Sequence, residues 1–121
     1  MPRGGATQSE LHQALVVAIR DYIRVRRGFC LKYFAGGIGA KKGMPDFLVA
    51  LPIPGSPLAA FVGIEAKTGA AVLNDDQVKV RAELEAAHVL YLVVHSPEEL
   101  EASLMQAGLI DAPALTARMF A

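Results

Sequence analysis

The stretch that decides the fold runs from residue 43 to residue 67 and reads GMPDFLVALPIPGSPLAAFVGIEAK. Its two runs of strand-forming residues are separated by a segment with three prolines and one glycine. Proline and glycine favour turns, so residues 46–51 and 61–67 are predicted to be strands. Because their connection is short, they should pair as an antiparallel hairpin. Asp46, which starts the first strand, then lies near Glu65, at the end of the second.

Charged side chains occupy an unusual place on the second strand. Side chains alternate between the two faces of a strand, so Glu65 and Lys67 point to the same face as Phe61. Burying a charge is costly unless the charge is paired or holds a metal ion. We therefore expect chemistry on this face. The alternative is that Asp46 is a simple strand-entry acid and that Glu65 and Lys67 form an exposed charge pair.

The sequence before this hairpin predicts a helix with one basic side. Thr7 and Glu10 have the spacing of a capping box, and the helix should end near Arg27. Its apolar stripe is predicted to consist of Leu11, Leu15, Ala18, Tyr22 and Val25. On helical spacing Arg20, Arg24 and Arg27 lie opposite this stripe. They are expected to form a basic ridge.

A further strand and a glycine-rich loop connect this helix to the hairpin. Residues 29–34 are rich in aromatic side chains and predict a strand. Residues 36–43 form a loop that carries Lys41 and Lys42. The loop lacks the GK[ST] ending of a P-loop and leads into a strand, so a phosphate-binding P-loop is excluded. It is either a substrate-contacting loop or a solvated connection.

The remaining sequence predicts two helices and one strand. Asn74 and Gln77 form a second capping box, and the following helix should bury Val78, Leu84 and Ala87. Residues 89–94 are continuously apolar, which is typical of a central strand covered on both faces. A last helix should start at Ser96 and end at Gly108, and residues 114–121 should add a turn or helix that covers the core or a dimer interface. The element order predicts an α/β sandwich with a mixed sheet.

Composition narrows the class of protein. The chain has 121 residues, 53% of them hydrophobic, which suits one domain spanning residues 1–121. No apolar run is long enough for a membrane span and the N-terminus lacks a signal-peptide core, so we expect a cytoplasmic protein. The single cysteine, Cys30, excludes an internal disulfide. His12, His88 and His95 show no metal-ligand spacing and are expected to be ordinary surface or core residues.

The net charge of zero conceals a division along the chain. Residues 1–48 hold eight basic and three acidic side chains, a balance of +5, whereas residues 49–121 hold four basic and nine acidic side chains, a balance of −5. A basic N-terminal half is compatible with a surface that faces a phosphate backbone. The alternative is a solvated helix face with scattered lysines.

Several motifs together resemble one family of nucleases. In chain order they are the basic glycine-rich stretch into Gly43-Met44-Pro45-Asp46, then Glu65-Ala66-Lys67-Thr68-Gly69, and then an acidic turn into Gln77. This order matches the PD-(D/E)xK nuclease signature and is similar to the small stand-alone VRR-NUC (virus-type replication-repair nuclease) group. The likeness covers about residues 8–95. It implies a restriction-endonuclease-like fold and metal-dependent hydrolysis of DNA.

The chemistry of these residues agrees with that reaction. Hydrolysis of a phosphodiester needs an activated water and stabilisation of negative charge, which hard divalent ions supply. Mg²⁺ prefers oxygen ligands, so Asp46 and Glu65 are the best candidate ligands, with Mn²⁺ also accepted. Lys67 would orient the water or offset phosphate charge. The resemblance adds the backbone carbonyl of Ala66 and the Glu10 carboxylate as metal ligands and Gln77 as a catalytic residue. Glu10 and Gln77 are otherwise explained by their capping boxes.

The substrate expected from the resemblance is branched or double-stranded DNA. Stand-alone members are similar to Holliday-junction resolvases, which act as homodimers. Five side chains are expected to contact the DNA backbone, namely Arg20, Arg24, Arg27, Lys41 and Lys42. The alternatives are a flap, end or restriction-type nuclease, and a DNA-binding module of the same fold that has lost catalysis.

Overall fold

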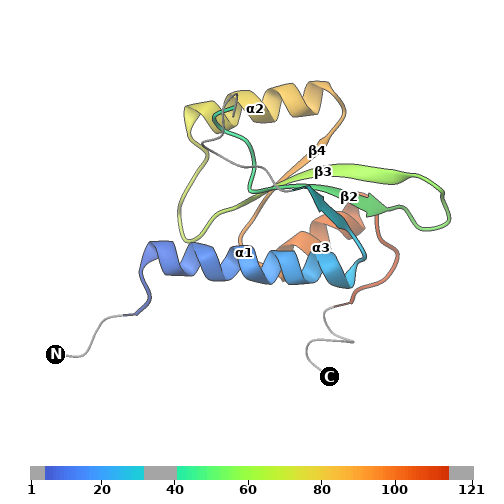
Figure 1. Cartoon of the computed structure of the whole chain (residues 1–121), viewed down its shortest axis with the longest axis horizontal. Helices are drawn as coiled ribbons and strands as arrows, with labels where there is room; N and C mark the ends of the chain where they lie inside the picture. Colours follow the sequence, from blue (N-terminus) through green and yellow to red (C-terminus); the bar gives the residue numbers. More distant parts are fainter. Residues whose placement is uncertain (1–4, 32–40, 115–121) are drawn as a thin grey trace.

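A computed structural model of the chain describes residues 5–31 and 41–114 and shows a mixed α/β fold with three helices and a four-stranded sheet (Figure 1). The elements are α1 (Gln8–Val25), β1 (Phe29–Leu31), β2 (Phe47–Pro52), β3 (Ala59–Ala66), α2 (Asp75–Ala86), β4 (Leu90–Val94) and α3 (Pro97–Gln106). This order is the predicted one. The predicted end of the first strand at residues 32–34, loop residues 36–40 and tail residues 115–121 lie outside the described part of the chain.

All three predicted helix starts are confirmed. Thr7 caps α1 and Asn74 caps α2, each in a complete capping box with the residue three positions later. The Ser96 side chain accepts a hydrogen bond from the backbone N–H of Glu99 at the start of α3. Gly108 follows α3 with a φ of 75°, a left-handed conformation that glycine adopts readily. Local sequence therefore fixes the helix boundaries.

The sheet is mixed, with the order β1-β2-β3-β4. β2 pairs antiparallel with both β1 and β3, which confirms the predicted hairpin. β3 pairs parallel with β4, and α2 lies between these two strands in the chain. The prediction of a central strand at residues 89–94 is wrong, because β4 lies at the edge of the described sheet. Its apolar sequence is explained by helices that pack on both of its faces.

The helices form layers on the two faces of the sheet. α1 and α3 contact each other on one face, and α2 lies across the other face, over β4 (Figure 1). The core on the α1 side is built from side chains of α1, β2, β3, β4 and α3: Leu15, Ile19, Tyr22, Ile23, Phe47, Val49, Leu51, Val62, Ile64, Ala66, Val94, Leu100 and Leu104. Among residues 5–31 and 41–114, no helix combines the length and apolar character that crossing a membrane requires.

Two predicted apolar stripes are confirmed only in part. On α1, the predicted Leu15 and Tyr22 are buried, but Leu11 and Val25 are more than two-fifths exposed, and the core also receives Ile19 and Ile23. The prediction followed heptad spacing, whereas α1 crosses a short sheet that only its middle turns reach. On α2, Val78 and Ala87 are exposed and Val80 is buried. α2 covers mainly β4, so a narrow apolar stripe is sufficient.

Candidate active site

Two carboxylates meet where β2 begins and β3 ends. Phe47 pairs with Ile64 in the antiparallel register, which places Asp46 beside Glu65. The backbone N–H of Asp46 donates to Oε1 of Glu65 at 3.2 Å. The backbone N–H of Ala66 donates to Oδ2 of Asp46 at 2.8 Å. The hairpin thus holds both acids in fixed positions, as the sequence predicts.

Burial and charge make this pair electrostatically unfavourable when both groups are ionised. Glu65 is only 4% exposed. Burial, reinforced by the negative charge of Asp46, raises the pKa of Glu65 from 4.5 to about 7, although the Lys67 ammonium acts in the opposite direction. Tyr91 lies on the strand next to β3, and burial together with the Glu65 charge raises its pKa to about 12. The site carries more negative charge than its own residues neutralise.

Lys67 and Gln77 complete the polar cluster. Nζ of Lys67 lies 3.5 Å from Oε2 of Glu65 and donates to Oε1 of Gln77 at 3.0 Å. Nε2 of Gln77 donates to Oε2 of Glu65 at 3.1 Å. Gln77 also accepts a hydrogen bond from the backbone N–H of Asn74 through its capping box. It therefore anchors α2 to the site while orienting Glu65 and Lys67, so the capping role and the site role coexist.

Gly43 brings the loop before Asp46 close to the start of α2. Its φ is 87°, which disfavours any residue with a Cβ. A Cβ at this position would also collide with the backbone carbonyl group of Asp76 and come within 2.8 Å of the backbone nitrogen of Gln77. Only glycine allows this approach, which brings the loop before Asp46 against the first turn of α2, where Gln77 donates to Glu65.

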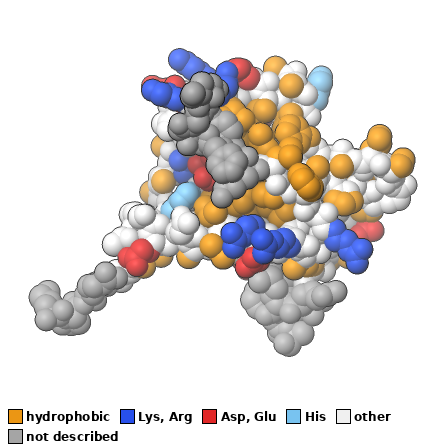
Figure 2. Space-filling view, in the orientation of Figure 1, with side chains coloured by type: hydrophobic (Ala, Val, Ile, Leu, Met, Phe, Trp, Pro, Cys, Tyr) orange, Lys and Arg blue, Asp and Glu red, His pale blue; other side chains and the backbone are white. Residues whose placement is uncertain are grey.

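The basic residues expected to contact DNA form two groups. Figure 2 shows Lys and Arg side chains over α1 and beside the start of α2. Arg20 and Arg24 line a pocket of about 470 Å³ that also reaches Asp46. Lys41 pairs with the exposed Glu83 at 3.0 Å. The two remaining candidates, Arg27 and Lys42, are exposed. The pocket places Arg20 and Arg24 of α1 on the same side of the sheet as the Asp46 end of the carboxylate pair.

The first turns of α1 face the other side of the site through Gln8 and His12. Nε2 of His12 lies 3.5 Å from Oδ2 of Asp46, and Oε1 of Gln8 accepts a hydrogen bond from Oγ1 of Thr68 at 3.1 Å. Both residues line a pocket of about 580 Å³ that includes Lys67. Sequence reasoning missed both, because it treated His12 as an isolated histidine. Their separation by four residues, which places them on one helix face, is a signal that points to the site.

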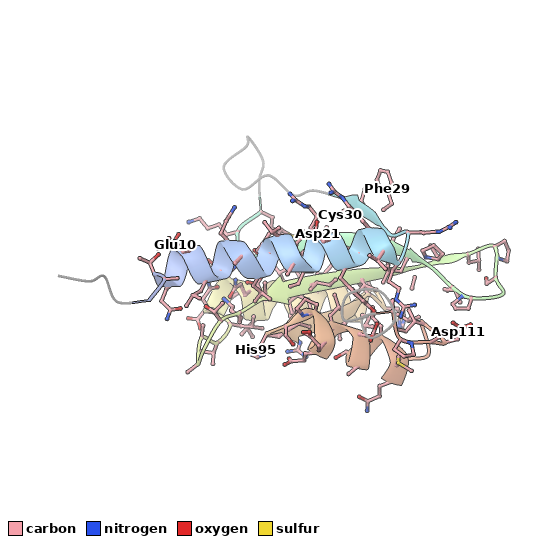
Figure 3. The ribbon with its side chains drawn as sticks, turned by 90° about the horizontal axis from the view of Figure 1, so that it is seen from below. Glu10, Asp21, Phe29, Cys30, His95 and Asp111 are labelled. Atoms are coloured by element: carbon pink, nitrogen blue, oxygen red, sulfur yellow. The ribbon has the colours of Figure 1, made fainter. Side chains whose placement is uncertain are left out.

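The structure does not bring Glu10 into the cluster. Its carboxylate accepts a hydrogen bond from the backbone N–H of Thr7 at 3.0 Å, which completes the capping box. Glu10 precedes His12 by two residues, or about 200° around a helix, so the two side chains leave opposite sides of α1. Figure 3 labels Glu10 at the start of this helix. The metal-ligand role of Glu10 stays a prediction.

The donor set fits a hard divalent cation held by few protein ligands. Within residues 5–31 and 41–114, no group of three or more His, Cys, Asp or Glu side chains is arranged to hold a metal ion. Mg²⁺, however, commonly uses one or two carboxylates and completes its shell with water and substrate oxygens. Asp46 and Glu65 provide that number, and a cation would relieve their repulsion. The buried Tyr91 hydroxyl has no hydrogen-bond partner among the described residues, which is unusual for a buried polar atom.

Comparisons with known proteins do not identify the chain. No protein-family model matches it, and searches of curated proteins and of solved structures find no match. The candidate site therefore rests on its own geometry, in which two converging carboxylates, one ammonium and one amide lie at the same end of the sheet.

Proposed function

We propose that the protein is a Mg²⁺-dependent endonuclease of the VRR-NUC type, with the restriction-endonuclease-like fold of the PD-(D/E)xK superfamily. The observation that carries this proposal is the fixed Asp46–Glu65 pair with Lys67 beside it. The order and spacing of the motifs around the pair support the same reading. Phosphodiester hydrolysis explains why an ion-binding pair and an ammonium are placed together.

In this proposal each side chain has a separate task. Asp46 and Glu65, with the Ala66 carbonyl, would hold the cation, which would supply Lewis-acid stabilisation and a more acidic bound water. Lys67 stabilises the charge that develops on the phosphate, or orients the attacking water. Gln77 keeps the Glu65 carboxylate and the Lys67 ammonium in place through its two hydrogen bonds.

The proposed substrate is branched DNA, cut as in Holliday-junction resolution by a homodimer that offers two sites for two strands. Arg20 and Arg24, at the pocket that reaches Asp46, would bind phosphates without reading bases. Such contacts favour selection by DNA shape over selection by sequence.

A cleavage assay tests the proposal. Labelled four-way junction, flap and linear duplex are incubated with the protein in Mg²⁺, Mn²⁺ or EDTA. We expect cleavage only with metal, and a loss of at least about 100-fold in Glu65→Gln and Lys67→Ala, as is usual when a transition-state contact is removed. Glu98→Gln, an exposed change on α3, is the control and should cleave normally. Full activity of both site variants would disprove the assignment.

A further inference from the structure

One row of side chains runs along α1 at intervals of four residues. It consists of Gln8, His12, Val16, Arg20 and Arg24. Residues four apart on a helix are neighbours on one face, so the five form a continuous row that is about 24 Å long at a rise of about 1.5 Å per residue. Each of the five lines one of the two pockets beside α1. We call this set the Gln8–Arg24 row.

The row passes the Asp46 carboxylate. Nε2 of His12 lies 3.5 Å from Oδ2 of Asp46, and the pocket that Arg20 lines also reaches Asp46. The other pocket begins at Gln8 and includes Lys67 of the candidate active site. Along α1, a pocket of about 580 Å³ therefore precedes the Asp46 carboxylate and a pocket of about 470 Å³ follows it.

The polar side chains of the row are of kinds that bind phosphate oxygens. Arg20 and Arg24 are exposed, and Figure 2 shows basic side chains over α1. Arg24 lies 3.9 Å from the exposed Asp21 carboxylate, a pair that water screens strongly. Oε1 of Gln8 accepts a hydrogen bond from Thr68, which leaves the two amide N–H donors of Gln8 for another partner. Guanidinium and amide donors both contact phosphates in complexes with DNA.

We propose that the Gln8–Arg24 row binds the backbone of one strand of a double-stranded DNA arm, which runs along α1 so that the bond to be cut lies at Asp46. The inference rests on the proposed nuclease function and adds the direction in which the substrate crosses the site. Charges on one strand of a duplex are about 3.4 Å apart along its axis, so a row of about 24 Å spans about seven phosphates. His12 is about 6 Å from Gln8 and about 18 Å from Arg24 along the helix, so the bound segment is shorter on the Gln8 side of the cut.

An added charge tests the row without removing any existing contact of the core. Gln13 is exposed and lines the same pocket as Arg20, whereas Leu11 is 43% exposed and lies two residues away, about 200° around α1. Fluorescence anisotropy in EDTA measures the binding of a labelled blunt 15-base-pair duplex over a range of salt concentrations. We expect Gln13→Lys to bind more tightly and to steepen the dependence of log K on log salt concentration by about 0.9, the value for one more phosphate contact. Leu11→Lys, with the same gain of charge, should leave this slope unchanged.

Removing side chains tests the two ends of the row in the same assay. Arg20→Ala should lower the slope by about 0.9, because one phosphate contact is lost. Lys79→Ala removes an equal charge from an exposed position on α2 and should not change it. Gln8→Ala should weaken binding about 5-fold with the slope unchanged, because the lost hydrogen bond involves no protein charge. Gln106→Ala, at an exposed position on α3, is its matched control and should bind normally.

Two outcomes would overturn the proposal. One is an equal gain of binding in Gln13→Lys and Leu11→Lys, which would mean that binding follows net charge and not position on α1. The other is parental affinity in Gln8→Ala. Failure of the nuclease function gives a different result, because cleavage would be absent with every metal while binding still depends on the row. Cleavage without any of these binding effects would retain the nuclease and reject the row.

Discussion

Among residues 5–31 and 41–114, two glutamates are buried, Glu65 and Glu101, with 4% and 7% of their surface exposed. Around Glu101, one oxygen accepts hydrogen bonds from Tyr22 Oη at 3.0 Å, from Arg26 Nη2 at 3.1 Å and from the backbone N–H of Ala114 at 2.7 Å. Around Glu65, the corresponding neighbours include a second carboxylate, that of Asp46. The two glutamates are therefore buried to a similar degree, but Glu101 lies beside a cation and Glu65 lies beside a second anion as well as a cation.

The difference lies in the charge balance of each cluster. Arg26 neutralises Glu101, and the same guanidinium donates to the backbone carbonyl of Ala112, so this cluster ties α1, α3 and the chain after α3 together. Lys67 offsets only one of the two charges on Glu65 and Asp46, which leaves a formal charge of −1 when these three groups are ionised and the imidazole of His12, 3.5 Å from Asp46, is neutral. A buried charge that lacks an opposite partner is costly. The Glu101 cluster is therefore suited to stability, and the Glu65 cluster to binding a cation.

Removing the Glu101 charge should give the largest stability effect. Glu101→Gln keeps the shape but leaves the mostly buried Arg26 guanidinium without its carboxylate. We expect a loss of about 3–5 kcal/mol in the free energy of unfolding, measured with urea. Glu98→Gln on the same helix is exposed and should cost less than about 1 kcal/mol. Equal losses in the two variants would show that Arg26 and Glu101 do not form a stabilising pair.

The Glu65 cluster should respond to pH in the opposite way to an ordinary ion pair. The pKa of Glu65 is raised to about 7 in the folded protein, from 4.5. Protonated Glu65 makes its full contribution to the free energy of unfolding below pH 4.5, and this contribution is lost as the pH rises through 7. At about 1.4 kcal/mol per pKa unit, the loss is on the order of 3 kcal/mol.

Glu65→Gln isolates this effect because it has no charge to titrate. In EDTA, the free energy of unfolding of the variant relative to the parent protein should increase by about 2–3 kcal/mol between pH 4.5 and pH 8. Mg²⁺ at pH 8 should raise the melting temperature of the parent protein but not that of the variant. A difference between the two proteins that is constant with pH would contradict the unpaired-charge interpretation.

The sequence predicted those features that depend on interactions between residues close to one another in the chain. The helix caps at Thr7, Asn74 and Ser96 bond to backbone groups three residues away. The proline-containing turn between β2 and β3 is also determined by its own few residues. Both kinds of feature could therefore be predicted from the sequence. The proximity of Asp46 and Glu65 follows from the pairing of the same two strands. The edge position of β4 and the burial of Ile19 depend on how helices and strands pack, which periodicity alone does not determine.

Sequence and structure point to different residues of α1 at the candidate site, and this difference can be tested. The sequence predicts Glu10 as a metal ligand, whereas the structure places His12 next to Asp46. If the structure is the better guide, Glu10→Ala should cost about 1 kcal/mol of stability through the lost cap and leave cleavage unchanged. His12→Ala should slow cleavage by less than about 10-fold, as fits a half-exposed contact worth about 1 kcal/mol. Initial rates over a Mg²⁺ titration measure both. Loss of cleavage in Glu10→Ala, with normal cleavage in His12→Ala, would restore Glu10 as the ligand and require α1 to turn when metal and DNA bind.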